Sequence, residues 1–377
     1  MTLKIGVVGA GGGVGTSRGM SFVRVARVLG EDTAVTAMCD IVPEYADRRA
    51  QEVGAEAFYD YEAMLDSGIG AVVVATPLPL HADMAVAALE RDIHVLSEVT
   101  ACHDFASAER LTRAARASKA VYMLSENYRY LDQVELLRRM AVDGRFGEIY
   151  HAEGEYLHDC RDLHRNADGS LTWRGKGWRG TYCTHSLGPL LYILDDRLTR
   201  VTAMSTGQPS RLDPEISFPE STTFLGQTQR GAMVKIRVDY QSPRPHKMDY
   251  YSLQGTHGSF EAWRGLGDQD KVWLADDHEP SRCWAPAGEI AQWHPLADYS
   301  AKYIPDRLAA GQTARSGGHS NSEYWLMQDF FAAVRGERES PIDVYKALDY
   351  TVPGICAAIS AENGGEPMDV PDYRTLA

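Results

Sequence analysis

The stretch that decides the fold of this chain reads Leu3-Lys4-Ile5-Gly6-Val7-Val8, followed by Gly9-Ala10-Gly11-Gly12-Gly13-Val14-Gly15. The mostly apolar residues 3–8 predict a short buried strand, and residues 17–29 predict a helix. Glycines between them let the backbone approach a pyrophosphate, which the helix N-terminus attracts. The turn is one residue longer than the usual G-x-G-x-x-G spacing. Its place between strand and helix favours a dinucleotide site over an ordinary tight turn, with its glycines and Val14 expected to contact the cofactor.

Asp40 follows the next predicted strand, residues 34–39. A carboxylate at this position accepts hydrogen bonds from ribose hydroxyls and repels a 2′-phosphate, so it favours NAD over NADP. The alternative is that Asp40 caps the helix that begins at Pro43.

Strands and helices alternate as far as residue 125. Further strands are predicted at 71–75, 94–97 and 121–125, and helices at 43–53, 81–89 and 106–118. The alternation predicts a doubly wound parallel sheet. Ligands of such sheets lie beyond the carboxyl ends of strands, so Thr76 and Pro77 are expected to line the cofactor. His81 is a further candidate there, although a packing role at the start of a helix is the stronger interpretation.

The pattern changes after residue 126. Helices are predicted at 133–142, 324–334 and 345–360, a strand at 149–157, and a hairpin over 250–262. Residues 232–240 alternate apolar and polar, which is typical of an antiparallel sheet with one wet face. Residues 208–222 and 276–321 are predicted as long loops, which are often functional lids. We therefore expect an NAD-binding domain over residues 1–125 and a substrate-binding and oligomerisation domain over 126–377.

Composition excludes several classes of function. The net charge of −14 disfavours nucleic-acid binding. No apolar run reaches the roughly 20 residues that span a bilayer, and no leader precedes the first strand, so a cytoplasmic protein without membrane contact is expected. Metal binding is not expected, because no cysteine pair has zinc-ligand spacing. The cysteines are Cys39, Cys102, Cys160, Cys183, Cys283 and Cys356.

Several motifs together resemble the Gfo/Idh/MocA family of sugar-acting oxidoreductases. They are the turn over residues 9–15, Ala75-Thr76-Pro77 with His81, His94-Val95-Leu96-Ser97-Glu98, Phe146-Gly147-Glu148-Ile149, Gln254-Gly255-Thr256-His257-Gly258-Ser259 and Pro341-Ile342-Asp343-Val344. The resemblance implies an N-terminal Rossmann domain, a C-terminal α/β domain with a large, mostly antiparallel open sheet, NAD as cofactor, and a homodimer or homotetramer. It also implies that Glu98 orients groups beside the nicotinamide. Asn127 and Tyr128, which follow the end of the predicted strand at 121–125, are expected to contact cofactor or substrate.

One departure from the family is informative. The Glu-Lys-Pro motif of the family reads Glu98-Val99-Thr100 here, and valine cannot carry the proton that the lysine carries. Thr181 stands near the place of a family aspartate, whereas His185 remains.

A second resemblance is to the NAD-dependent glycoside hydrolases, the α-N-acetylgalactosaminidase-like group. It is carried by Tyr156-Leu157-His158-Asp159-Cys160-Arg161 and by Gly180-Thr181-Tyr182-Cys183-Thr184-His185-Ser186-Leu187-Gly188-Pro189. These enzymes also lack the lysine and cleave glycosides through transient oxidation. Tyr156, Tyr182 and His185 become the catalytic candidates. The alternatives are a core aromatic for Tyr156 and a structural role for His185.

Substrate contacts are expected from two stretches. His158, Asp159 and Arg161 follow Tyr156, and the last two share a strand face, where they could bind sugar hydroxyls or simply pair with each other. The cluster Trp173-Arg174-Gly175-Lys176-Gly177-Trp178-Arg179 could bind an anionic sugar group through Arg174, Lys176, Trp178 and Arg179, or be a solvated hairpin. Sulfoquinovosidases belong to the same broad family. His319 is a weaker candidate for the substrate pocket.

Three functions remain open from the sequence. The first is an NAD-dependent glycosidase acting through a 3-keto sugar, the second is a sugar or inositol dehydrogenase with net redox, and the third is a non-catalytic NAD sensor.

Overall fold

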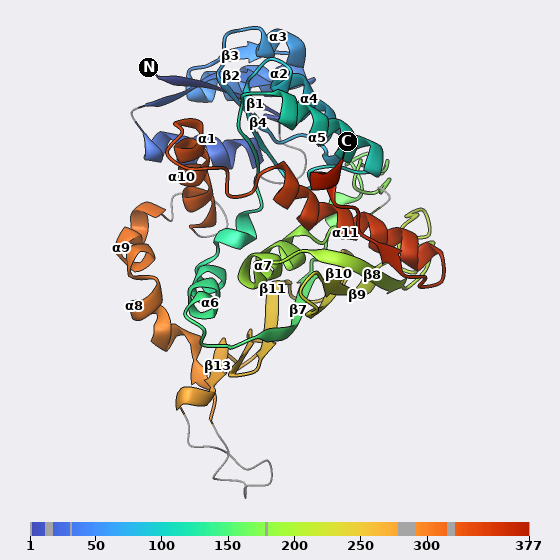
Figure 1. The fold of residues 1–377 in the computed structure, drawn as a ribbon. Coiled ribbons are helices and arrows are strands. Elements are labelled where there is room, and N and C mark those ends of the chain that lie inside the picture. Colours follow the sequence, from blue (N-terminus) through green and yellow to red (C-terminus); the bar gives the residue numbers. More distant parts are fainter. Residues whose placement is uncertain are drawn as a thin grey trace, which may run out of the picture.

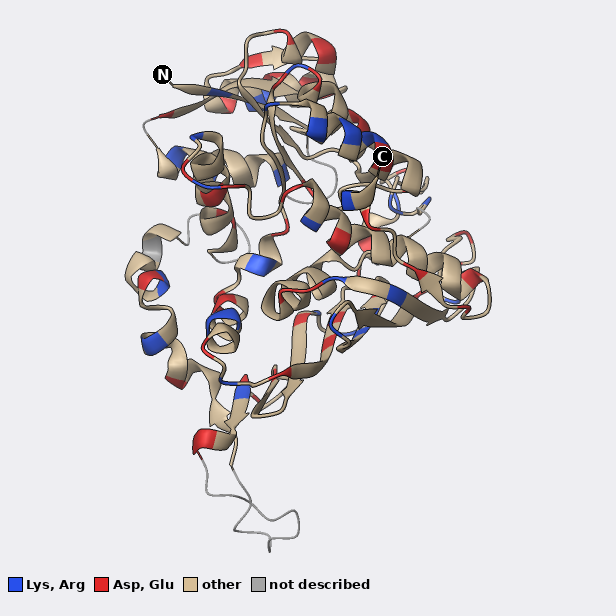
Figure 2. Cartoon of the chain, in the orientation of Figure 1, with Lys and Arg blue, Asp and Glu red and all other residues tan. Residues whose placement is uncertain are grey.

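The computed structural model describes residues 2–11, 18–30, 32–177, 180–277, 292–314 and 321–376. Two sheets organise this part of the chain, one above the other in Figure 1. Acidic and basic residues are interspersed along the described part of the chain (Figure 2).

The N-terminal sheet has six parallel strands within the described residues. Their order is β3 (Glu56–Phe58), β2 (Thr33–Cys39), β1 (Leu3–Val8), β4 (Ala71–Val74), β5 (His94–Ser97) and β6 (Tyr122–Leu124). The strand order reverses between β1 and β4, which is where such sheets bind ligands. All four residues of β4 are buried, as a strand covered on both faces requires.

In the described part of this region, five α-helices connect the strands: α1 (Arg18–Leu29), α2 (Pro43–Val53), α3 (Tyr61–Leu65), α4 (His81–Leu89) and α5 (Phe105–Ala117). The sequence predicted α2, α4 and β5 with these bounds. It missed the short β3 and α3, whose lengths of three and five residues leave no clear period.

The C-terminal sheet has nine strands within the described residues. Their order is β14 (His294–Pro295), β13 (Lys271–Leu274), β12 (Gly258–Glu261), β11 (Lys247–Gly255), β7 (Ile149–Leu157), β10 (Met233–Asp239), β9 (Ser221–Thr228), β8 (Leu198–Ser205) and β15 (Met368–Asp369). Neighbouring strands run antiparallel except β7 and β10, so the predicted mostly antiparallel sheet is confirmed. Val234, Ile236 and Val238 are buried on one face of β10, as their spacing predicted.

The remaining helices are α6 (Asp132–Val142), α7 (Thr184–Leu194), α8 (Ser300–Tyr303), α9 (Pro305–Ala314), α10 (Ser322–Val334) and α11 (Val344–Glu362). Helix α7 packs on β7 and β11. Helix α11 packs on β8 and also contacts α5 of the N-terminal region (Figure 1). Gly154 of β7 allows the approach of α7, because a Cβ atom there would lie 2.5 Å from the carbonyl oxygen of Ser186.

The loop predicted over 276–321 is wrong for its described residues, which contain β14, α8 and α9. The proline and polar residues of this stretch do not exclude helix, because a proline is tolerated in the first turn, where Pro305 begins α9, and the helix is interrupted at Gly311, with φ 51°. The domain division at residue 125 stays a prediction.

No helix in the described ranges is both long and apolar enough to cross a membrane. Cys39, Cys102, Cys160, Cys183 and Cys356 are buried free thiols, and Cys283 lies outside the described residues.

Candidate functional site

The turn after β1 brings the backbone close to the end of β4. Gly9 has φ +82°, and a Cβ atom there would lie 2.5 Å from the carbonyl oxygen of Ala75, so the position requires glycine. The N–H of Gly11 donates to Oδ2 of Asp40 at 2.6 Å. Asp40 therefore faces the glycine turn, and Val42 is the N-cap residue of α2. The predicted contacts Gly12, Gly13, Val14 and Gly15 lie outside the described residues.

His81 lies between the loops that follow β4 and β5. Its Nδ1 and Nε2 atoms are 3.0 and 2.8 Å from the carbonyl oxygens of Thr100 and Thr76. The side chain is buried, and burial lowers the pKa of His81. Because both ring nitrogens face backbone, the geometry favours the packing interpretation over a cofactor contact. Pro77 is the residue before the short helix of residues 78–80, and Thr76 remains half-buried at the strand end.

Glu98 is held by an arginine that sequence reasoning missed. Nε of Arg18 lies 2.9 Å from Oε1 of Glu98, and Nη1 of Arg18 lies 2.9 Å from Oε1 of Glu323. Val99, at the family's lysine position, is 5% exposed. The ion pair with Arg18 suits the orienting role expected of Glu98. Arg18 lies 80 positions from Glu98 and 305 from Glu323, so no local motif could have revealed these contacts.

The three catalytic candidates come together. Tyr182, Tyr156 and His185 form an aromatic cluster, in which Tyr156 and His185 are buried and Tyr182 is half-buried. The ring centroid of Tyr156 lies 5.7 Å from that of Tyr182 and 5.3 Å from that of His185. Tyr128 stacks on the His185 imidazole at 4.2 Å. Burial raises the pKa of Tyr156 and of Tyr182 well above the ordinary value, so neither phenol ionises unaided.

Each tyrosine has an imidazole partner. The Tyr182 hydroxyl lies 3.2 Å from Nε2 of His185, and Nδ1 of His185 lies 2.8 Å from Oε1 of Glu126. The Tyr156 hydroxyl lies 2.8 Å from Nδ1 of His158. The cluster therefore contains two separate phenol–imidazole pairs.

Glu126 was also missed from the sequence, although an acid directly after β6 was a usable signal. Its side chain has no exposed surface. Oε2 of Glu126 and Nδ2 of Asn127 are buried without a hydrogen-bond partner in the described structure. Buried polar atoms of this kind need a partner, so both are candidate contacts for a bound ligand.

Asp159 and Arg161 pair with each other. Strand β7 ends at Leu157, and Arg161 begins a short helix over residues 161–163, so the predicted shared strand face is wrong. Nη2 of Arg161 lies 2.6 Å from Oδ2 of Asp159, and this pairing lowers the pKa of Asp159 to about 2. The geometry favours the ion-pair interpretation over a clamp for sugar hydroxyls.

Arg174 and Lys176 lie on an exposed turn. The Arg174 guanidinium lies 4.2 Å from the centroid of the Trp173 ring. Its positive charge opposes the burial-driven rise in the pKa of Tyr156 and of Tyr182. Arg174 is therefore near enough to the aromatic cluster to influence it electrostatically. Trp178, Arg179 and His319 lie outside the described residues.

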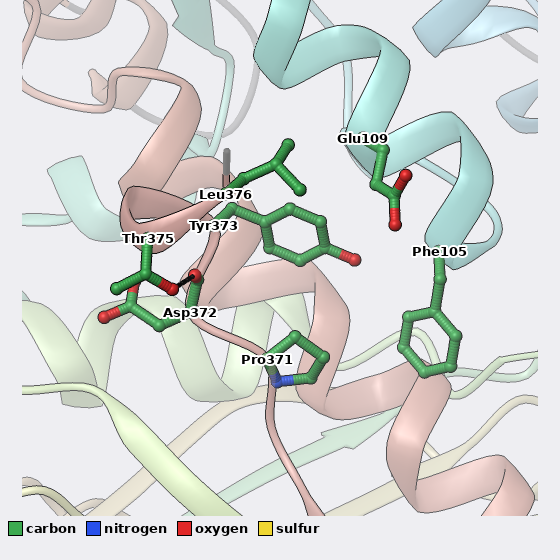
Figure 3. Close-up of a pocket in the computed structure, with 7 residues that line it drawn as sticks. All are labelled: Phe105, Glu109, Pro371, Asp372, Tyr373, Thr375 and Leu376. Atoms are coloured by element: carbon green, nitrogen blue, oxygen red, sulfur yellow. Dashed lines mark hydrogen bonds between the residues drawn. The ribbon is translucent and has the colours of Figure 1, made fainter.

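A separate open hollow lies beside α5 and the C-terminal residues (Figure 3). Its lining consists of Phe105, Glu109, Pro371, Asp372, Tyr373, Thr375 and Leu376. None of these residues was predicted to act on a ligand.

Three family models match the chain. Residues 3–126 match an oxidoreductase family with an NAD-binding Rossmann fold, residues 134–261 match a GFO/IDH/MocA C-terminal domain, and residues 219–376 match a glycosyl hydrolase 109 C-terminal domain. The expected NAD cofactor is thereby confirmed. The close approach at Gly9, the position of Asp40 and the unpartnered amide of Asn127 fit such a ligand.

Curated relatives extend over nearly the whole chain. A glycosyl hydrolase family 109 protein of Saccharopolyspora erythraea is 27% identical over 412 aligned residues, covering 99% of this chain and 83% of that protein. A glycosyl hydrolase family 109 protein of Porphyromonas gingivalis is also 27% identical, and the alignment covers 99% of this chain and 84% of that protein.

Solved structures share the fold. Levoglucosan dehydrogenase, in complex with NADH and L-sorbose, has a TM-score of 0.79 at 19% identity, covering 99% of this chain and 100% of that one. The WlbA dehydrogenase of Bordetella pertussis, in complex with NADH and UDP-GlcNAcA, has a TM-score of 0.74 at 19% identity, covering 98% of each chain. The chain belongs to the Gfo/Idh/MocA oxidoreductase family and, within it, carries the C-terminal domain of glycosyl hydrolase family 109.

Proposed function

We propose that this protein is an NAD-dependent glycoside hydrolase. Carbon 3 of the sugar is oxidised transiently, the group on carbon 1 is eliminated, water adds, and carbon 3 is reduced again. The observation that carries the proposal is the pair of separate phenol–imidazole contacts, Tyr182 with His185 and Tyr156 with His158. Redox-neutral cleavage moves protons at two sites of the sugar, the carbon 3 hydroxyl and carbon 2, whereas simple oxidation moves one.

Gly9, Gly11, Asp40, Glu98 and Asn127 would hold the cofactor. When bound, NAD accepts hydride from the sugar and later returns it. Arg18 keeps Glu98 as a paired carboxylate, which suits orientation rather than proton transfer.

The first proton carrier acts at the carbon 3 hydroxyl. Tyr182 accepts that proton while its own passes to Nε2 of His185, and the Glu126 carboxylate stabilises the imidazolium that forms. This is the arrangement of a general base oriented by an acid, as in the Ser-His-Asp triad. Valine at position 99 leaves this task to phenol and imidazole.

The second carrier acts at carbon 2. The ketone at carbon 3 acidifies the carbon 2 hydrogen, which Tyr156 removes as its own proton passes to His158. The electron pair left on carbon 2 expels the group on carbon 1. Water then adds to carbon 1 and a proton returns to carbon 2, so the net reaction is hydrolysis.

An anionic sugar is the substrate class that we propose. Arg174 and Lys176 lie on an exposed turn, and the Arg174 charge acts on Tyr156 and Tyr182. A guanidinium binds a carboxylate or sulfonate through paired hydrogen bonds.

Turnover in deuterated water tests the proposal. We would incubate the protein and NAD with a panel of 4-nitrophenyl glycosides, including an N-acetylgalactosaminide and a uronide. The expected result is release of nitrophenol, deuterium at carbon 2 of the product sugar, and no net NADH. Hydrolysis with hydrogen retained at carbon 2 would contradict the mechanism.

A sugar dehydrogenase is the second candidate, since levoglucosan dehydrogenase shares the fold. It predicts NADH in proportion to substrate. A non-catalytic NAD sensor predicts no turnover on any glycoside of the panel. The homodimer or homotetramer expected from the family stays a prediction.

A further inference from the structure

We infer that His246 is the solvent end of a proton route that begins at Tyr156 and passes through His158. The inference rests on the proposed function, because it concerns the base that acts at carbon 2. His246 acts through His158 and is therefore a positioning residue.

The three side chains contact one another in turn, and their exposure increases from Tyr156 to His246. Tyr156 is 7% exposed, and its hydroxyl lies 2.8 Å from Nδ1 of His158. The His158 ring is half-buried, and its centroid lies 4.6 Å from that of His246, with 56° between the ring planes. His246, directly before β11, is exposed. The route thus connects a buried phenol with bulk water in two contacts.

Such an exit is needed because Tyr156 must lose its own proton before it can take one from carbon 2. Burial lowers the pKa of His158 to about 4, and the nearby charges of His246, Arg174 and His185 act in the same direction, against Asp159. An imidazolium at His158 is therefore unfavourable. When Nδ1 of His158 takes up a proton, Nε2 can release its own, so the ring passes a proton on without remaining charged.

The transfer balances without any other reactant. The C–H bond at carbon 2 breaks and an O–H bond forms on Tyr156. The former Tyr156 proton moves to Nδ1 of His158, and the Nε2 proton leaves toward His246. Reprotonation of carbon 2 reverses these transfers.

The other carrier lacks a comparable exit among the described residues. His185 is 8% exposed, Glu126 is fully buried, and Tyr128 covers the imidazole face. Loss of His246 should therefore slow the chemistry at carbon 2 and spare the oxidation at carbon 3.

The test compares His246→Gln with His257→Gln. Both histidines are exposed and flank β11 at its opposite ends, so the second variant controls for loss of a surface imidazole. With the 4-nitrophenyl glycoside that the wild-type protein cleaves, His246→Gln should lower kcat about tenfold or more with little change in KM. Added imidazole should restore the rate of this variant.

A second readout separates this route from the rest of the mechanism. In a single turnover, His246→Gln should leave the rate of transient NADH formation unchanged and slow the entry of deuterium at carbon 2. If His246→Gln has the same two rates as His257→Gln, the proton route is overturned, whereas the proposed glycosidase function is not. Wild-type protein that hydrolyses no glycoside, or does so without deuterium at carbon 2, overturns the proposed function and the route with it.

Discussion

Oε1 of Glu126 lies 2.8 Å from Nδ1 of His185, on a carboxylate with no exposed surface. A carboxylate at Glu126 can only accept, which requires the proton on Nδ1 of His185 and leaves Nε2 to accept from the Tyr182 hydroxyl. In the proposed mechanism, this acid, two residues after β6, selects the tautomer in which His185 acts as a base on Tyr182.

Replacement of that acid tests its role. Glu126→Gln keeps the size of the side chain but removes the charge that stabilises the imidazolium. We expect kcat to fall about 10²-fold or more, with a smaller change in KM. Circular dichroism and a thermal melt check that the variant is folded. A folded variant with wild-type kcat would contradict the relay through His185.

The two tyrosines should fail at different steps. Tyr182→Phe removes the carrier at the carbon 3 hydroxyl, so transient NADH formation should be slowed about 10²-fold or more. Tyr156→Phe should still form NADH with the glycoside but release little nitrophenol, because elimination follows removal of the carbon 2 proton. Stopped-flow absorbance of NADH and nitrophenol measures both steps. Equal loss of NADH formation in both variants would argue against separate carriers.

The limits of sequence reasoning follow from the range of the contacts. Strand and helix periods are local, so β5, α4 and β7 were predictable, and so was the face of β10. Tyr182 and His185 were found because they lie three residues apart at the start of α7. The contact of His185 with Glu126 joins residues 59 apart, and it depends on how α7 docks on the sheet. No period in the sequence reports that docking.

Gly154 controls the docking of α7 and hence the position of His185. A Cβ atom at this position would lie 2.5 Å from the Ser186 carbonyl oxygen, and backbone cannot give way as a flexible side chain can. Gly154→Ala should lower the free energy of unfolding by roughly 1–3 kcal/mol. It should also lower kcat, because the carbonyl of His185 accepts from Tyr251 at 2.6 Å and the helix would have to shift. Gly144→Ala is the comparison, because a Cβ atom at Gly144 would meet no neighbouring atom. Its positive φ alone should lower the free energy of unfolding by less than Gly154→Ala does. Urea unfolding measures both.

The stretch over residues 206–220 should contribute a pH-dependent part of the stability. Burial alone would raise the pKa of Glu220, but hydrogen bonds from Thr206, Ser210 and the Arg211 N–H hold it at about 2, below the ordinary 4.5. Ionised Glu220 therefore stabilises the fold above about pH 4.5, and this contribution is lost as the pH falls toward 2. Glu220→Gln should cost about 1–2 kcal/mol at pH 7 and roughly half of that or less at pH 3. Thermal melts at the two pH values test this. An equal deficit at both would show that the carboxylate charge is not the cause.

Substrate charge provides the last prediction, and it concerns Arg174. Arg174 is exposed beside Trp173, and its charge opposes the burial-driven rise in the pKa of Tyr156 and of Tyr182, the two candidate catalytic tyrosines. If it binds an anionic sugar group, Arg174→Met should lower kcat/KM for a 4-nitrophenyl uronide by about 10- to 100-fold, as for loss of one charged hydrogen bond. The value of kcat/KM for the neutral glycoside should fall much less, because that substrate has no anionic group for Arg174 to bind.

Arg200→Met is a suitable control for that comparison. Arg200 is an exposed arginine of β8, paired with Asp369 at the edge of the C-terminal sheet. Its loss changes the net charge of the protein by the same amount without touching the aromatic cluster, so the ratio of kcat/KM for the two glycosides should remain that of the wild type. If Arg174→Met lowers both glycosides equally, the arginine supports the tyrosines rather than selecting a charged sugar. If both variants shift the ratio, the preference arises from overall charge and not from this turn.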